Sequence, residues 1–102
     1  MSKSGEEIKL PDKDLVVERV QTGVRMEKRM VKVLKALAEY LDISLGDLLE
    51  GIVLHAFEND PPFSSQTLQQ IARLKEVYGM DYGVEFSHHL TELPPTQKEE
   101  KR

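Results

Sequence analysis

The feature that most constrains this chain is a change in the spacing of its apolar residues after residue 26. In residues 19–26 apolar and polar side chains alternate, with Val20 and Val24 on the apolar side. Alternation with period two is typical of a β-strand that has one buried and one exposed face. From residue 28 onward apolar residues recur at steps of three and four, which is the spacing of an amphipathic helix. The sequence therefore predicts one strand that leads almost directly into a helix.

The segment after this strand predicts two helices separated by a short break. The first runs from residue 28 to residue 40 or 41, and the second begins after Ser44, which is a favourable N-cap. Asp47 places a carboxylate near the first amides of the second helix, as in a capping box. The apolar residues of the second helix are Leu45, Leu48, Leu49, Ile52, Val53, Ala56 and Phe57. They surround much of the helix, so burial on several sides is expected before Pro61 and Pro62 end it.

The first sixty residues contain a single predicted strand, which leaves its backbone amides and carbonyls without partners. The second helix likewise has more apolar surface than the first helix alone covers. Two copies of the chain solve both problems, because their strands pair antiparallel about a two-fold axis and their four helices close a shared core. The alternative is a short strand at residues 82–90, where side chains also alternate, pairing within the same chain. The sequence favours the homodimer.

Charge is distributed unevenly along the chain. The net charge is −4, but residues 19–35 carry six bases and one acid, and residues 36–60 carry six acids and no Lys or Arg. A local basic segment steers a polyanion more than the total charge does. A nucleic-acid partner is therefore expected at residues 19–35, and a solvated, lysine-rich helix face is the alternative.

The order and lengths of these parts resemble the ribbon-helix-helix family of the Arc and MetJ repressors. The resemblance covers residues 18–58, ERVQTGVRMEKRMVKVLKALAEYLDISLGDLLEGIVLHAFE, where an alternating strand leads into a charged helix start and a capped turn leads into an apolar second helix. It implies a mainly α fold, a ribbon-helix-helix homodimer with an intermolecular two-stranded antiparallel ribbon, here with a C-terminal helical extension. In that family the ribbon enters the major groove of double-stranded DNA, and the start of the second helix lies against phosphate.

The resemblance assigns base-reading positions to Gln21, Gly23 and Arg25 on the outward face of the ribbon. Arg25 is expected to donate two hydrogen bonds to guanine and Gln21 to pair with adenine, whereas Gly23 brings no side chain. Val20, Thr22 and Val24 are expected to point into the core of the dimer. The expected phosphate contacts are Arg19, Lys28, Arg29, Ser44, Leu45 and Gly46. The turn into the second helix would contribute mainly through its backbone amides.

The chain divides into four segments. They are a flexible N-terminal arm at residues 1–14, the dimerisation and DNA-binding unit at residues 15–60, a C-terminal extension at residues 61–93 and a disordered tail at residues 94–102. Within the extension, a third helix is predicted from Ser65 to Tyr78, with Gly79 as the residue that ends it. The extension has no counterpart in the minimal ribbon-helix-helix module. One hypothesis for its role is that it binds a protein partner.

The sequence lacks the usual patterns of catalytic and metal sites. It has no cysteine, no Gly-rich phosphate loop and no nucleophile motif, so an enzyme is not expected and no cofactor is assigned. His88 and His89 are adjacent and would point to opposite faces of a strand, and together with His55 they lack metal-ligand spacing. No apolar stretch approaches the ~20 residues of a membrane span and no signal segment is found, so a cytoplasmic location without membrane contact is expected.

These observations predict a dimeric, sequence-specific DNA-binding protein, namely a bacterial transcriptional regulator of the repressor type. The alternatives are a dimeric scaffold that does not bind DNA, and an antitoxin that binds its toxin through residues 61–93. The acidic total charge and Gly23 favour the scaffold. The basic segment at residues 19–35 favours DNA.

Overall fold

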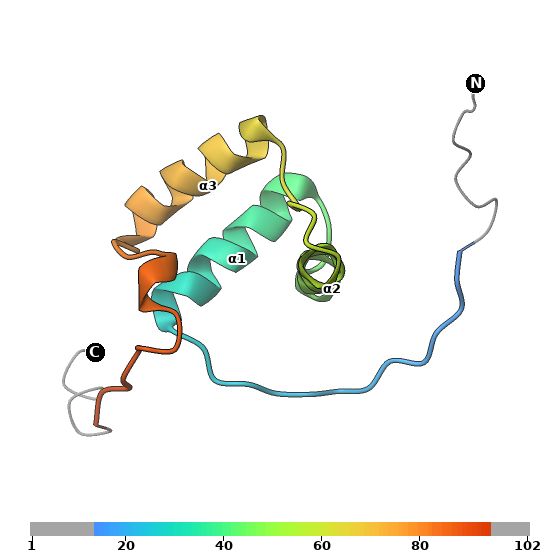
Figure 1. Ribbon diagram of the computed structural model, residues 1–102, viewed down its shortest axis with the longest axis horizontal. Helices are drawn as coiled ribbons and strands as arrows, with labels where there is room; N and C mark the ends of the chain where they lie inside the picture. Colours follow the sequence, from blue (N-terminus) through green and yellow to red (C-terminus); the bar gives the residue numbers. More distant parts are fainter. Residues whose placement is uncertain (1–13, 95–102) are drawn as a thin grey trace.

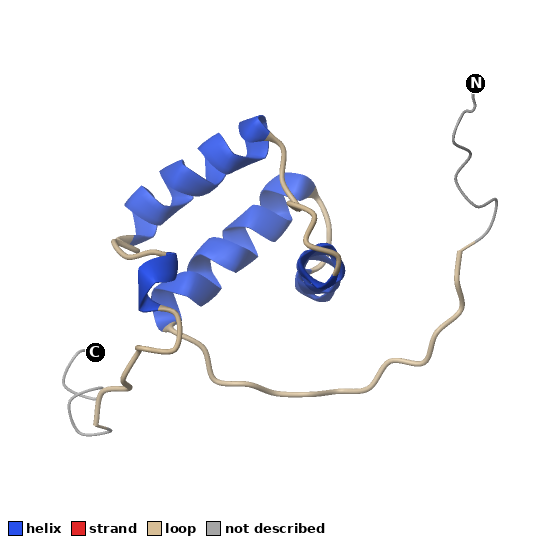
Figure 2. Ribbon diagram, viewed as in Figure 1, coloured by secondary structure: helices blue, strands red, loops and turns tan. Residues whose placement is uncertain are grey.

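In residues 14–94 the chain forms three α-helices and a short 3₁₀ helix, preceded by an extended segment (Figure 1). These are the residues that the computed structural model describes. The helices are α1 (Lys28–Leu41), α2 (Leu45–Phe57), α3 (Ser65–Tyr78) and the 3₁₀ helix η1 (Val84–Phe86). No strand occurs in this part of the chain (Figure 2), and the prediction of a mainly α fold is confirmed. The predicted arm and tail lie outside the described residues, except for residues 14 and 94.

α1 has the predicted bounds, and both of its ends are capped by neighbouring residues. The Glu27 carboxylate accepts hydrogen bonds from the backbone amides of Arg29 and Met30, at 3.0 and 3.1 Å. These amides belong to the first turn, where a helix offers no acceptor of its own. At the other end Asp42 adopts a left-handed conformation with φ of 61°, and its N–H donates to the carbonyl of Glu39 at 3.1 Å. Local hydrogen bonds therefore set the length of α1.

α2 begins after Ser44, as predicted. The Ser44 hydroxyl oxygen accepts a hydrogen bond from the N–H of Asp47 at 3.0 Å. Asp47 also adds a negative charge in the first turn, where the helix dipole favours it. The helix ends at Phe57, and Asn59 then turns the chain with a φ of 55° shortly before two prolines.

α3 also has its predicted bounds. The Ser64 hydroxyl oxygen accepts from the N–H of Thr67 at 3.2 Å and caps the start of the helix. Gly79 ends the helix in the left-handed conformation, with φ of 70°, which costs other residues about 1–2 kcal/mol. Beyond it the N–H of Met80 donates to the carbonyl of Lys75 at 2.8 Å, so the last turn is closed by a backbone bond.

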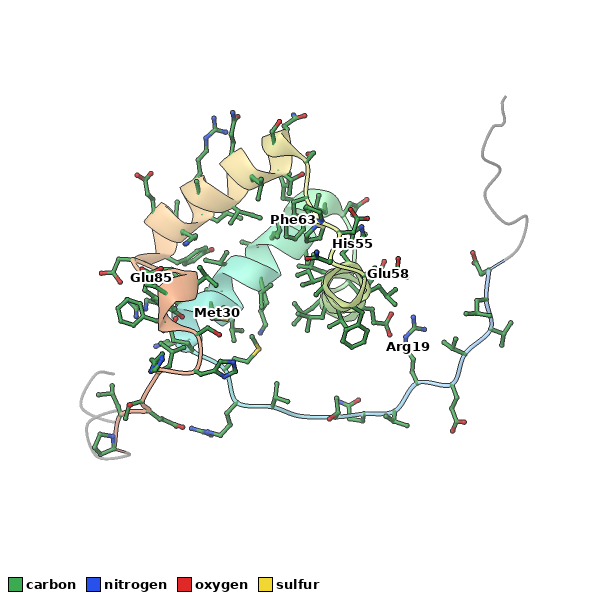
Figure 3. All side chains as sticks on the ribbon, in the orientation of Figure 1. Arg19, Met30, His55, Glu58, Phe63 and Glu85 are labelled. Atoms are coloured by element: carbon green, nitrogen blue, oxygen red, sulfur yellow. The ribbon has the colours of Figure 1, made fainter. Side chains whose placement is uncertain are left out.

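The core lies where α1, α2 and α3 meet. Its buried centre consists of Leu37 and Ala38 from α1 and Leu48 from α2. Partly buried residues surround this centre, namely Leu34, Leu41, Ile52, Phe63, Ile71 and Leu74. α3 packs along α1, and the segment before α3 brings Phe63 to the core (Figure 3). The C-terminal extension is therefore built into the same core as the first two helices.

The strand predicted at residues 82–90 is wrong. Val84–Phe86 form η1 instead, with i to i+3 backbone hydrogen bonds of 3.0 Å. His88 follows with a φ of 68°, which interrupts an extended backbone. Alternating side chains are not sufficient for a strand, because a strand also needs a neighbour for its backbone groups. The alternative in which this segment pairs with residues 19–26 of the same chain is therefore wrong as well.

Residues 14–27 run as an extended segment that leaves the helices (Figure 1). They form no strand or bridge with any described residue, and residues 14–26 are all exposed. A ribbon requires a second copy of the segment. The ribbon and the homodimer therefore stay predictions.

The helices are short compared with the length needed to cross a membrane. α1 and α3 have 14 residues each, and none of the helices between residues 14 and 94 combines the length and apolar content that a bilayer span requires.

Candidate nucleic-acid interface

The predicted base-reading positions lie on the extended segment. Gln21, Gly23 and Arg25 are all exposed. A Cβ at Gly23 would meet no atom within 4 Å, so the space beside this position is open. Because each of these positions follows the previous one by two, they would share one face if the segment formed a strand.

Arg19 is bound to α2 through a carboxylate. Its Nε and Nη2 donate to the two carboxylate oxygens of Glu50 at 2.9 and 2.8 Å, and Figure 3 shows Arg19 directed from the extended segment toward α2. The hydrogen bond with Glu50 raises the pKa of Arg19 and lowers the pKa of Glu50. The charge of Asp47 raises the pKa of Arg19 further. Arg19 therefore lies close to the first turns of α2, so two parts of the predicted phosphate-binding surface come together.

Arg25 is held by a carboxylate from far along the chain. Its Nε donates to Oε1 of Glu92 at 3.2 Å, and its Nη2 donates to Oε2 of the same carboxylate. Hydrogen bonding to Glu92 raises the pKa of Arg25. The two side chains remain 75% and 50% exposed. A pair that is this open to solvent is screened and exchanges readily with other partners.

Arg29 is the predicted phosphate contact that is most involved in the fold. Its guanidinium donates to Glu27 at 3.0 Å, to the carbonyl of Gly79 at 2.9 Å and to Asp81 at 3.3 Å. Its Cζ lies 5.4 Å from the centre of the Tyr82 ring, within the range of a cation–π interaction. Arg29 therefore joins the start of α1 to the chain beyond α3.

Glu27 is the centre of this cluster. The Tyr82 hydroxyl donates to Glu27 Oε1 at 2.7 Å. Partial burial alone would raise the pKa of Glu27, but hydrogen bonds from Tyr82, Arg29 and the Met30 amide lower it to about 2. Burial and the hydrogen bond to Glu27 raise the pKa of Tyr82 to about 12. At neutral pH the cluster therefore contains an ionised carboxylate and a protonated phenol.

Replacing Glu27 with Gln is expected to lower the free energy of unfolding by about 0.5–2 kcal/mol at pH 7, the usual effect of weakening a helix cap. The pKa of Glu27 is about 2 in the folded protein, against 4.5 for a model glutamate. The unfolded chain therefore binds more protons between these values, and the stabilisation is complete above pH 4.5 and is lost as the pH falls toward 2.

Urea denaturation of both proteins at pH 7 and pH 3 measures this effect, and the difference between them should shrink at the lower pH. Glu39→Gln, on the exposed face of α1, makes the same change in charge and serves as the control. If the two variants lose equal stability at pH 7, the Glu27 cap has no special contribution.

Three lysines line one side of α1. Lys28 is the first residue of the helix, and Lys32 and Lys35 follow at steps of four and three residues. All three are exposed, and this side of the helix lies opposite the buried Leu37. Lys32 Nζ also lies 6.0 Å from the ring centre of Tyr78 in α3. The structure thus adds Lys32 and Lys35 to Lys28 as an exposed basic stripe.

The turn into α2 combines favourable and unfavourable features for an anion. Leu45 and Gly46 are the first residues of α2, where backbone amides have no intrahelical acceptor and the helix dipole attracts negative charge. Gly46 is exposed, and a Cβ there would meet no atom within 4 Å. The Ser44 hydroxyl oxygen accepts from the amide of Asp47, whose carboxylate adds a negative charge to the same turn. The donors that this turn could offer to a phosphate are therefore its backbone amides and the Ser44 O–H.

Sequence reasoning does not predict that Glu50 pairs with Arg19 or that Glu92 pairs with Arg25. The paired residues are separated by 31 and 67 positions in the sequence. No helical or strand spacing connects residues so far apart. The general excess of acids outside residues 19–35 is the one signal of such pairs in the sequence.

Histidine and acidic side chains do not gather into a metal site in the part of the chain that the structure describes. No group of three or more His, Cys, Asp or Glu side chains there is suited to hold a metal ion. His55 Nδ1 lies 2.8 Å from the carbonyl oxygen of Gly51, one turn earlier in α2. His55 is half-buried.

Comparisons with protein-family models, with curated proteins and with solved structures found no match to this chain. A function for this chain must therefore be argued from its residues and their geometry.

Proposed function

We propose that this protein is a homodimeric, sequence-specific DNA-binding protein that acts as a transcriptional regulator. Residues 19–26 of two chains pair antiparallel, and the resulting ribbon enters the major groove of double-stranded DNA. The observation that carries the proposal is the exposed and unpaired backbone of residues 14–26 beside a folded helical core. Such a segment is a template for pairing with a second copy, because its amides and carbonyls form no ladder within the described chain.

Apolar side chains on the extended segment support this pairing. Val20 and Val24 are exposed in the single chain, although their spacing puts them on one face. In the dimer this face lies against the helices. Each Å² of apolar surface removed from water there stabilises the dimer by about 25 cal/mol.

α2 offers a second apolar surface for the same interface. Leu48 and Ile52 pack in the core, whereas Leu49, Val53 and Phe57 lie on another side of the helix and form the α2 outer face. Val53 and Phe57 are exposed, and Leu49 is half-buried. An exposed apolar helix face suits a contact between two copies about a two-fold axis, and Glu50 lies at the edge of this face.

Base and phosphate recognition then follow from the polar residues of the ribbon and the adjoining helix ends. In the major groove Arg25 would donate to guanine and Gln21 would pair with adenine. Arg19, Lys28 and the backbone amides at the start of α2 are the proposed phosphate contacts. The carboxylate partners of both ribbon arginines lie in exposed ion pairs, which DNA can displace.

Binding to duplex DNA across a salt series tests the proposal. The purified protein is titrated with random and genomic fragments between about 50 and 200 mM salt, and the slope of affinity against salt is measured. Release of counterions from phosphate predicts a steep loss of affinity, and a preferred genomic sequence is expected for a regulator. No binding at the lowest salt concentration would overturn the proposal.

Arg25→Ala is expected to weaken binding to the preferred sequence by about 10- to 100-fold, because two hydrogen bonds to one base are lost. Binding to random DNA should weaken much less. Arg73→Ala removes the same charge from an exposed position on α3 and is the control. Size-exclusion chromatography checks that both variants keep the oligomeric state of the wild type. Equal losses in the two variants would show that Arg25 acts as a charge and does not read a base.

One observation favours a second candidate, a dimeric scaffold that does not bind DNA. Arg19 and Arg25 are both held by carboxylates of their own chain, Glu50 and Glu92. A protein that uses these arginines only to hold its extended segment would show the same pairs. An intact dimer without DNA binding in the salt series would favour this candidate, with residues 61–93 as the surface for a protein partner such as a toxin.

A further inference from the structure

The chain that follows α3 returns to the start of α1 and contacts the junction between the extended segment and that helix. In Figure 1 the segment after η1 passes beside the point where α1 begins. Tyr82 donates a hydrogen bond to Glu27, and Glu92 accepts hydrogen bonds from Arg25. The C-terminal extension therefore reaches the end of the proposed ribbon.

We propose that Glu92 competes with DNA for Arg25, so that the C-terminal extension lowers the affinity of the protein for DNA. The inference rests on the proposed function, because it concerns the guanidinium that is proposed to read a base. It gives the extension a regulatory role at the DNA-binding surface in addition to its place in the core.

The competition follows from the shape of the guanidinium. Its N–H groups form a planar fork that matches a carboxylate and the edge of guanine through the same pair of parallel hydrogen bonds. In the unbound chain Nε and Nη2 of Arg25 both donate to Glu92. A guanine that uses this side of the fork must first displace the carboxylate.

The fold keeps Glu92 close to Arg25. Ten residues earlier, Tyr82 is anchored by its 2.7 Å hydrogen bond to Glu27. The Tyr82 ring also makes an edge-to-face contact with Phe86, with ring centres 6.2 Å apart. A carboxylate tethered in this way has a high effective concentration at the guanidinium, unlike a carboxylate in solution.

The exposure of the pair sets the size of the effect. With 75% of the Arg25 side chain and 50% of the Glu92 side chain exposed, water and salt screen the attraction. DNA can therefore displace Glu92, and the extension is expected to tune the affinity without blocking binding.

Glu92→Gln tests the inference, since it removes the negative charge and keeps the size of the side chain. The variant is expected to bind the preferred DNA sequence about 2- to 5-fold more tightly than the wild type at low salt. Glu85→Gln is the matched control, because it makes the same change in net charge in η1 without removing the partner of Arg25. Its affinity should lie much closer to that of the wild type.

A double-mutant cycle with Arg25→Ala identifies the source of the gain. When Arg25 is absent, Glu92 has no base-reading group to compete for, so Glu92→Gln should then leave the affinity unchanged. An equal gain in the Arg25→Ala background, or an equal gain from Glu85→Gln, would overturn the inference in favour of a general charge effect.

The remaining outcomes separate this inference from the proposed function. Wild-type binding to DNA with no gain from Glu92→Gln would overturn the inference and leave the proposed function standing. No DNA binding by either protein at low salt would overturn the proposed function, and the inference with it.

Discussion

Leu37→Ala is expected to lower the free energy of unfolding by about 2–5 kcal/mol. Leu37 is 2% exposed and lies with Ala38 and Leu48 at the centre of the core. The substitution removes buried apolar surface and leaves a cavity that the surrounding helices close only in part. Because a small domain has a total stability of about 5–15 kcal/mol, the loss is a large share of it.

Urea denaturation followed by circular dichroism measures this loss. The protein concentration must be the same in all samples, because the stability of a dimer depends on concentration. Leu68→Ala makes the same change on the exposed side of α3 and is the control, with an expected effect within about 0.5 kcal/mol. Similar losses in the two variants would show that the packing around Leu37 does not hold the three helices together.

The helices could be predicted because the residues that start and stop them are their neighbours in the sequence. α2 begins after Ser44 and α3 ends at Tyr78, just before Gly79, both at the predicted positions. A hydroxyl cap and a glycine in the left-handed conformation act through hydrogen bonds within a few residues. Such signals need no knowledge of the tertiary fold.

Strands depend on partners, so the two alternating segments could not be distinguished by their pattern. Residues 82–90 satisfy part of their backbone locally through η1 and the turn after it. Residues 19–26 take part in no backbone hydrogen bond among the described residues. The structure therefore distinguishes a segment whose backbone is partly hydrogen-bonded within the chain from an exposed segment whose backbone is open to water.

The positions of the candidate site stay predictions, and their surroundings could not be predicted. Gln21 and Arg25 are exposed, but so are Val20 and Val24, so the single chain does not distinguish the two faces of residues 19–26. The partner of Arg25, however, depends on where α3 and η1 deliver Glu92, and only tertiary packing decides that. The same holds for Glu27, which the sequence shows only as an acid among bases and which the structure shows as the cap of α1.

Phe57→Ser is expected to raise the dissociation constant of the dimer by at least about 100-fold if two copies pack through the α2 outer face. Phe57 is 81% exposed in the single chain, so the substitution removes little packing there. In the dimer the side chain would be buried, and it would be lost twice, once from each copy. Val77→Ser at the end of α3 is the control, because Val77 is 71% exposed and lies outside the proposed interface.

Sedimentation velocity over a range of protein concentrations measures the dissociation constants. The wild type and Val77→Ser should be dimers at concentrations where Phe57→Ser is a monomer, and the melting temperature of the wild type should rise with concentration. If the wild type stays monomeric at every concentration, the proposed ribbon and the proposed contacts with DNA bases are both wrong. Phe57→Ser should also lose DNA binding, because a monomer cannot form the ribbon. Since Phe57 lies outside the proposed DNA contacts and the core, the loss of both properties would tie DNA binding to the dimer interface.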